Sequence, residues 1–316
     1  MSSSRCPCRR TPDAQRAAHI FEQDRHLPLA QRRYTDPYAK PELVCALTRF
    51  EALCGVRPAG EIRAWLDAAG LADGMRPVPT DSAPADVREF LARWLRQSGP
   101  DRTRRIARLV DAATRRAADD PISRRILALA AHWPGDPGLI APVLLHDITL
   151  EPGEALFLPA GILHCYLSGT AIELMAASDN VVRAGLTDKP VHVDEVLEVA
   201  SVASAASLAC HAVFREHEQV WSPAATHGFQ LSRFDLETGR PIEVRTHSLE
   251  ILLCHAGHVE VTSDDGRIML EQGDALAVPA ALASHALSGN GTIFRAALQA
   301  PGVPVCDGAG REPMPE

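Results

Sequence analysis

The chain has little lysine, no long apolar run and no excess of positive charge. Among its 32 Lys and Arg residues, only Lys40 and Lys189 are lysines. No apolar segment approaches the roughly 20 residues of a membrane-spanning helix, so we expect no membrane partner. The formal net charge of -8 argues against nucleic acid as a partner, because nucleic-acid-binding domains usually carry a basic stripe.

The N-terminal segment 1–11 is basic, but no apolar segment follows it, so it does not resemble a signal peptide. Without a secretory leader, the 8 scattered cysteines are expected to be reduced, which predicts a cytoplasmic protein. The one close pair, Cys6 and Cys8, is spaced too tightly for a usual zinc knuckle. We therefore expect an unstructured tail at this end of the chain.

Apolar residues recur at helical spacing through most of the segment 60–133. The pattern predicts helices at 61–69, at 84–95, around 106–113 and at 122–133, after an apolar strand at 41–53. Arginines are frequent in this segment. We expect them on the solvated faces of amphipathic helices, and an anion-binding patch is the alternative.

The second half of the chain contains an internal repeat. Residues 150–169 read LEPGEALFLPAGILHCYLSG and residues 270–289 read LEQGDALAVPAALASHALSG, with about half of the positions identical and no gap. A tight Gly turn, an acidic residue and a buried strand that ends in Pro are typical of a cupin, a small jelly roll whose interior can hold a metal. The sequence therefore predicts a mainly β fold with two cupin domains and a helical insertion.

The two copies of the repeat differ at one informative position. His164 follows the strand in the first copy, whereas Ser284 stands at the equivalent place in the second. His285 lies one residue later and would point to the opposite face of a strand. An inward-facing neutral imidazole is a natural metal ligand, and a hydrogen-bonded structural histidine is the alternative. The difference indicates that only the first copy retains a site.

Two segments carry a resemblance to a known family. Residues 155–189 read ALFLPAGILHCYLSGTAIELMAASDNVVRAGLTDK, and residues 34–58 read YTDPYAKPELVCALTRFEALCGVRP. Both resemble the marked segments of type I mannose-6-phosphate isomerases, and weaker similarity extends over nearly all of the chain from residue 12. The resemblance implies a zinc-dependent aldose-ketose isomerase, a monomer with one zinc per chain, that interconverts mannose 6-phosphate and fructose 6-phosphate.

The same resemblance, carried over position by position, implies roles for individual residues. Glu42 and His164 would be zinc ligands, while Arg183 and Lys189 would face the substrate for catalysis or phosphate contact. Lys40 would point to the same strand face as Glu42 and act in catalysis. The secondary candidates are Glu173 for catalysis and Asp179 and Tyr166 for substrate binding, with packing as the alternative for all three. Both lysines of the chain fall in these segments. Since arginine serves almost everywhere else, this indicates that the two positions need a compact, titratable ammonium.

The expected ligand set is incomplete. The family has a Gln and a His one residue apart just before a Pro, and here Arg9 and Thr11 stand at those positions before Pro12. The strands that should precede them are also missing, which predicts a first cupin domain that is incomplete at its N-terminus. We interpret 1–11 as non-native sequence from a truncated or frameshifted start, with a shortened paralogue as the alternative. A catalytic zinc site normally has three protein ligands and a water, so weak zinc binding and an inactive chain are expected.

These patterns give a predicted domain organisation and leave alternative functions open. The predicted parts are a first-cupin remnant at 1–58, a helical insertion at 59–135, the zinc-site half of the first cupin at 136–190 and a degenerate cupin at 191–316. A non-catalytic cupin that binds a phosphorylated hexose would keep the same cations without needing the metal. A cupin dioxygenase is disfavoured, because such sites usually cluster several histidines.

Overall fold

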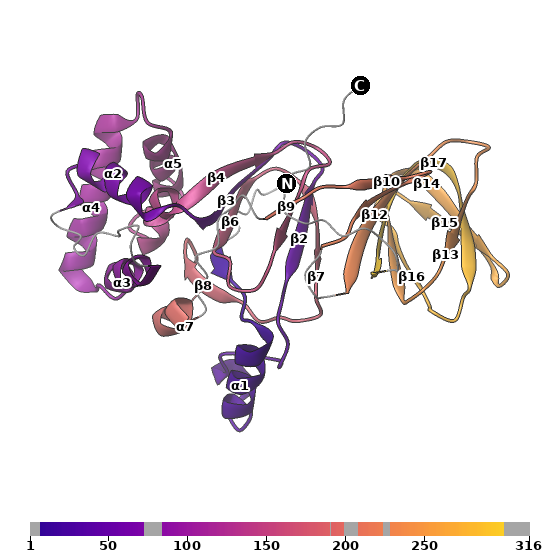
Figure 1. Cartoon of the computed structure of the whole chain (residues 1–316), viewed down its shortest axis with the longest axis horizontal. Coiled ribbons are helices and arrows are strands. Elements are labelled where there is room, and N and C mark those ends of the chain that lie inside the picture. The colour runs from indigo at the N-terminus through magenta and orange to yellow at the C-terminus, as the bar shows by residue number, and fades with distance from the viewer. Residues whose placement is uncertain (1–6, 73–83, 190, 199–207, 224–227, 300–316) are drawn as a thin grey trace. The chain divides into compact units, whose positions relative to one another are not determined.

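The computed structural model describes residues 7–72, 84–189, 191–198, 208–223 and 228–299 (Figure 1). Contacts between residues divide the chain into two compact units. The first comprises Met1–Glu42, Ala46–Pro152 and Leu158–Leu208, and the second comprises Leu43–Cys45, Gly153–Phe157 and Ala209–Glu316. The structure is mainly β with a helical insertion, as the sequence predicts, while the finer domain bounds stay a prediction.

A five-stranded antiparallel sheet of the first unit has the order β4-β3-β6-β1-β8. Its strands are β1 (Cys8–Arg10), β3 (Phe50–Val56), β4 (Leu145–Leu150), β6 (His164–Ser168) and β8 (Val182–Gly185). The expectation of an unstructured tail is wrong for Cys8–Arg10, because this segment pairs with β6 on one side and β8 on the other. Cys8 is buried among apolar side chains, and this burial adds to the strand pairing that holds β1 in place.

A four-stranded sheet has the order β7-β2-β5-β9. Its strands are β2 (Glu42–Ala46), β5 (Ala155–Leu158), β7 (Ala171–Met175) and β9 (Ala209–Cys210). All five residues of β2 are buried, which explains why the sequence reads as a continuous apolar run there. The single strand predicted at 41–53 is therefore wrong in one respect, because β2 and β3 divide that segment between two sheets.

The predicted helical insertion is present. The helices of the first unit are α1 (Ala14–Asp24), α2 (Ala59–Ala68), α3 (Pro84–Leu95), α4 (Gly99–Arg116), α5 (Pro121–Ala130), α6 (Ala141–Leu144) and α7 (Val193–Glu198), with 3₁₀ turns η1 (Leu29–Gln31) and η3 (Pro137–Ile140). Helices α2 to α5 gather beside one another in Figure 1. Asp120 begins α5 by accepting hydrogen bonds from the backbone N–H groups of Ile122 and Ser123, which caps the helix.

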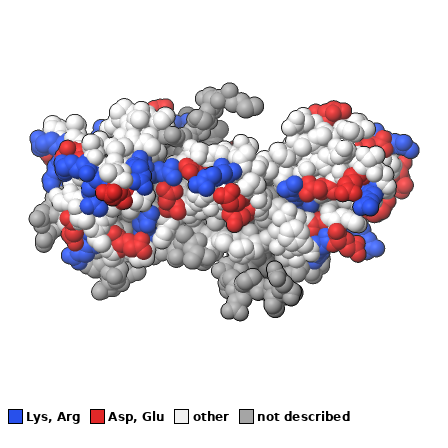
Figure 2. Space-filling view, turned by 90° about the horizontal axis from the view of Figure 1, so that it is seen from above, with Lys and Arg blue, Asp and Glu red and all other residues white. Residues whose placement is uncertain are grey.

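Several arginines of the insertion are paired with acidic neighbours on their own helices. Arg93 lies 3.0 Å from Glu89, and Arg115 contacts Asp111. Figure 2 shows Lys and Arg interspersed with Asp and Glu on the face that it draws. These contacts fit the interpretation of solvated helix faces better than that of an anion-binding patch.

The second unit contains an eight-stranded sheet with the order β10-β11-β12-β17-β14-β15, in which β13 also pairs with β17 and β16 with β14. The strands are β10 (Val213–Arg215), β11 (Glu218–Trp221), β12 (Phe229–Leu236), β13 (Ile242–Arg245), β14 (Glu250–Ser263), β15 (Gly266–Glu271), β16 (Ala275–Val278) and β17 (Ser284–Leu298). The sequence repeat is confirmed as a structural one, because β16 and the start of β17 match β5 and β6 at the same spacing. In each copy the turn glycine has positive φ, 89° at Gly153 and 95° at Gly273.

Five cysteines are buried thiols outside any disulfide: Cys8, Cys45, Cys54, Cys165 and Cys254. Cys210 is disulfide-bonded, so the expectation that all cysteines are reduced is wrong for this residue. Within the ranges that the structure describes, no helix is both long and apolar enough to cross a membrane.

Candidate functional site

Three polar residues lie side by side on β6, β1 and the edge strand β8 of the five-stranded sheet. Arg9 on β1 is the register partner of His164 on β6 and of Arg183 on β8. Directly opposed residues on neighbouring strands project from the same face of a sheet. The strand pairing therefore brings two cations and the predicted ligand His164 to one face.

Arg9 is the centre of this group of side chains. Its Nε donates to His164 Nε2 at 3.0 Å, and its terminal nitrogen donates to Glu173 Oε1 at 2.7 Å. The same nitrogen lies 3.8 Å from Glu42 Oε2, and the guanidinium carbon lies 5.2 Å from the centre of the Tyr166 ring. We call Arg9, Lys40, Glu42, His164, Tyr166 and Glu173 the Arg9 cluster.

The hydrogen bonds of His164 define which of its nitrogens carries a proton. Arginine can only donate, so Nε2 must accept from Arg9 through its lone pair. Nδ1 lies 3.0 Å from the carbonyl oxygen of Ile162 and must then donate to it. This is the tautomer in which a histidine binds a metal through Nε2 while a backbone carbonyl orients the ring.

Glu42 is a buried carboxylate without a hydrogen-bond donor among the described residues. Its side chain is 1% exposed, and neither oxygen has a hydrogen-bond partner of good geometry. Burial acts to raise the pKa of Glu42, but the contact with His164 and the positive charges of Arg9 and Lys40 outweigh it and lower the pKa. Lys40 Nζ lies 3.8 Å from Glu42 Oε1. The negative charge of Glu42 is therefore compensated by the nearby positive charges of Arg9 and Lys40.

Tyr166 and Glu173 form the more open side of the Arg9 cluster. The Tyr166 hydroxyl donates to Glu173 Oε1 at 3.0 Å. Burial, followed by the negative charges of Glu173 and Glu42, raises the pKa of Tyr166 well above its ordinary value, so the hydroxyl stays a donor. The Glu173 side chain is 26% exposed, so it is the carboxylate of the cluster that a solute can reach.

The other predicted residues lie outside the contacts of the Arg9 cluster. Arg183 shares the sheet face, and its buried Nε has no hydrogen-bond partner in the described part of the chain. Lys189 and Asp179 are exposed. Their described hydrogen bonds run through the backbone, from Lys189 N–H to Thr187 Oγ1 and from Asp179 N–H to Asp36 Oδ2. The roles predicted for these three residues stay predictions.

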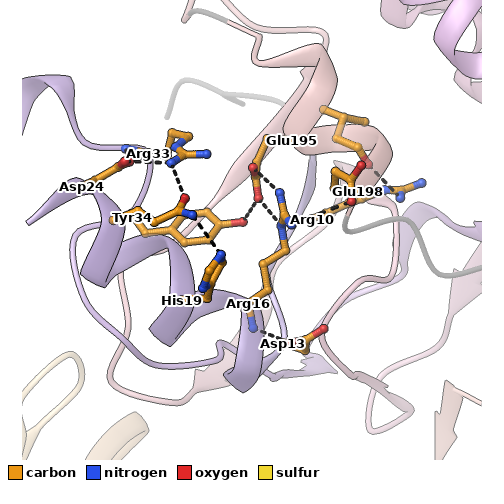
Figure 3. A network of polar contacts seen from close by, with 11 residues as sticks. Arg10, Asp13, Arg16, His19, Asp24, Arg33, Tyr34, Glu195 and Glu198 are labelled. Atoms are coloured by element: carbon orange, nitrogen blue, oxygen red, sulfur yellow. Dashed lines mark hydrogen bonds and ion pairs between the residues drawn. The ribbon is translucent and has the colours of Figure 1, made fainter.

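A second polar network, not predicted from the sequence, anchors the segment that carries Arg9. Arg16 binds both oxygens of Glu195 at 2.7 Å, and the Tyr34 hydroxyl donates to the same carboxylate (Figure 3). Arg10, which follows Arg9 on β1, donates to the Val196 carbonyl oxygen at 3.3 Å. Residues that follow Arg9 in the chain are thus tied to α7. The partners are far apart in the chain, so no local pattern could have indicated the network.

A zinc ion does not fit the Arg9 cluster as it stands. A catalytic zinc needs three protein ligands and a water, and no group of three or more His, Cys, Asp or Glu residues suited to a metal occurs among the described residues. The predicted donors Glu42 and His164 do lie together, with 3.1 Å between the closest oxygen and nitrogen. Both are in contact with the guanidinium of Arg9, which brings a positive charge where a metal would bring its own.

Comparison with known proteins identifies the family. Mannose-6-phosphate isomerase of Salmonella typhimurium is 32% identical over 268 residues, an alignment that covers 84% of this chain and 68% of that protein. This chain belongs to the mannose-6-phosphate isomerase family. The human mannose-6-phosphate isomerase is 32% identical over 195 residues, which cover 56% of this chain and 46% of the human protein. No family model matches the chain.

Solved structures of mannose-6-phosphate isomerases agree with this assignment. A crystal structure of a phosphomannose isomerase variant from Salmonella typhimurium superposes with a TM-score of 0.84 at 29% identity, covering 95% of this chain and 77% of that one. A zinc-bound mannose 6-phosphate isomerase gives a TM-score of 0.83 at 28% identity, with the same coverage. Zinc is thus a cofactor in the family, and the cupin-type fold predicted from the repeat is confirmed.

Proposed function

We propose that this chain interconverts mannose 6-phosphate and fructose 6-phosphate, the reaction of the isomerases to which it is similar. The observation that carries the proposal is the Arg9 cluster, which keeps Glu42, His164 and Glu173 together around one guanidinium. An accessible carboxylate beside several cations is the chemistry that an aldose-ketose isomerase needs.

Binding of the substrate would use the cations outside the ion pairs of the cluster. A phosphate dianion is held best by charge-assisted hydrogen bonds from Arg or Lys. Arg183 lies opposite Arg9 on the same sheet face and is half-buried, so its guanidinium suits a contact with the phosphate. Lys189 follows β8 shortly after Arg183 and is exposed, which suits a second contact with the phosphate.

Proton transfer is assigned to Glu173. The carboxylate removes the proton from C2 of the aldose, and the electron pair moves to the carbonyl oxygen at C1 to give a cis-enediolate. The proton returns at C1 while the 2-hydroxyl loses its proton to the oxygen at C1, which completes the ketose. The positive charges of Arg9 and Lys40 stabilise the negative charge that develops on these oxygens. Glu42 is too buried to reach the carbon.

The test is turnover of mannose 6-phosphate by the purified 316-residue chain, followed by NMR in deuterated water. Formation of fructose 6-phosphate with deuterium at the transferred position supports the proposal. Glu173→Gln should lower kcat by about 100-fold, because general base catalysis contributes roughly that much, while substrate affinity changes little. Binding of fructose 6-phosphate without turnover or exchange would overturn the proposal and favour a non-catalytic hexose-phosphate-binding protein.

Two predictions about the whole chain accompany this proposal. The sequence predicts a monomer, which light scattering after gel filtration can measure. It also predicts a cytoplasmic protein, and the bonded Cys210 runs against the reduced thiols on which that prediction rests.

A further inference from the structure

The guanidinium of Arg9 makes the contacts that a bound metal ion would make. It takes the lone pair of His164 Nε2 at 3.0 Å. It also lies 2.7 Å from an oxygen of Glu173 and 3.8 Å from an oxygen of Glu42. A nitrogen base and two carboxylates therefore converge on one positive group, and that group belongs to the chain.

The contacts of Arg9 compensate the negative charges in the Arg9 cluster. Two carboxylates that are largely removed from water need compensating positive charge. Arg9, held between β6 and β8, supplies it together with Lys40, which lies 3.8 Å from Glu42. A divalent cation would have to approach His164 through the guanidinium and would be repelled by its charge.

We propose that Arg9 takes the place of the metal in this member of the family, so that the Arg9 cluster excludes zinc and its resident cation is a guanidinium. The proposal rests on the proposed function only in taking the Arg9 cluster as the site of the reaction. It also implies that Arg9 keeps a second cation away from Glu42 and His164, the two predicted donors that lie 3.1 Å apart. Once the guanidinium is removed, these two side chains and Glu173 are left without the charge of Arg9.

The experiment measures zinc affinity by titration with a competing chelator, together with zinc content after gel filtration. The wild-type chain should retain far less than one zinc per molecule. Arg9→Gln should bind zinc at least about 10-fold more tightly, which corresponds to about 1.4 kcal/mol. Adding His164→Ala to Arg9→Gln should abolish the gain, because it removes the imidazole donor.

Two further variants separate charge from other effects. Arg9→Lys keeps a cation in the Arg9 cluster, so its zinc affinity should stay as low as that of the wild type. Arg16→Gln is a matched control, because Arg16 also binds a buried carboxylate through two short contacts, but no described histidine contacts that carboxylate. It should leave zinc affinity unchanged even where it lowers stability.

Two results would overturn the proposal. One is a wild-type chain that holds about one zinc and loses it on His164→Ala, which needs no Arg9 variant to fold. The other is a folded Arg9→Gln, checked by circular dichroism, without a gain in zinc affinity, or an equal gain in Arg9→Lys. None of these measurements uses turnover, so failure of the proposed isomerase reaction would leave their result intact.

Discussion

The buried acidic side chains differ in how their charge is compensated. Asp24 accepts hydrogen bonds from the side chain and backbone of Arg33, and Glu195 accepts them from Arg16 and Tyr34. Glu42 has no such donor of good geometry among the described residues, and its neighbours are His164 at 3.1 Å and the cations Arg9 and Lys40 at 3.8 Å. Fully hydrogen-bonded carboxylates stabilise a fold, whereas one left without donors costs free energy. The burial of Glu42 is therefore best explained by a functional role in the Arg9 cluster.

The Asp24–Arg33 pair predicts a stability change in acid. The hydrogen bonds from Arg33 outweigh burial and lower the pKa of Asp24 from 3.8 to about 2. Because the unfolded chain takes up the proton first, this contribution is complete above about pH 4 and is lost as the pH falls towards 2. Asp24→Asn should lower the free energy of unfolding by about 1–2 kcal/mol at pH 7.

Urea unfolding at pH 7, 4 and 2.5 measures this effect. The difference between wild type and Asp24→Asn should shrink towards pH 2.5. Asp101→Asn, which removes an exposed ion pair with Arg104, is the control and should change stability by less than about 0.5 kcal/mol. An equal loss in Asp24→Asn at all three pH values would contradict the assignment.

Arg183 predicts a binding defect. Arg183→Gln removes the positive charge but keeps a planar donor at the same strand position, so the fold should be preserved. The KM for mannose 6-phosphate should rise by about 10-fold, since a charge-assisted hydrogen bond contributes about 1.5–3 kcal/mol. Steady-state kinetics measures the change, and Arg233→Gln, on β12 of the second unit, is the control. Equal KM values for the two variants would exclude Arg183 from phosphate binding.

The sequence could predict part of the Arg9 cluster, but not that Arg9 lies at its centre. His164 and Glu42 were found because both lie in segments that resemble a known family, and they do lie together. Arg9 was identified only as a substitution at a missing ligand. Its contact with His164 joins residues 155 positions apart, and such contacts follow from strand pairing that no local pattern encodes.

At the level of elements, the junction of η3 with the end of β8 depends on two glycines. A Cβ on Gly185, where φ is 145°, would lie 2.7 Å from the Cα of Gly138. Asp136 Oδ1 accepts from the N–H groups of Gly138 and Leu186, at 2.6 and 2.8 Å. The backbones therefore meet without room for a side chain, which fixes the end of the strand that carries Arg183.

This junction predicts a marked effect of a single methyl group. Gly185→Ala should lower the free energy of unfolding by more than about 2 kcal/mol, since it adds a backbone clash to backbone strain. Gly266→Ala is a matched control with nearly the same φ, 140°, and no atom within 4 Å of the added Cβ. Chemical denaturation measures both. Equal losses would show that strain alone accounts for the effect.

Helices and strands were predicted best where a period or a repeat was present. Helix α3 begins and ends where the apolar spacing predicted, at Pro84–Leu95. The division of 41–53 into two strands was missed, because both strands are buried and neither shows alternation. Strand β1 was missed because three residues carry no pattern.

At the level of the whole molecule, duplication has given two copies with different interiors. At the start of β6, His164 is buried and contacts Arg9, whereas Ser284 at the start of β17 is exposed. His285 is buried and lies 3.3 Å from Thr246 Oγ1, and burial followed by the charge of Arg295 lowers its pKa to about 4. The repeat thus predicted the architecture of the chain, while the loss of a site in the second copy stays a prediction and side-chain partners had to come from the structure.

The scarcity of lysine makes the folded state easy to follow chemically. Lys40 is 6% exposed, whereas Lys189, the other lysine of the chain, is exposed. Brief treatment of the native chain with an amine-reactive acylating reagent should therefore modify Lys189 and spare Lys40, as peptide mass spectrometry can record. Unfolding exposes Lys40 and so adds one reactive ε-amine per molecule. The chain thus carries an intrinsic chemical reporter for its own unfolding.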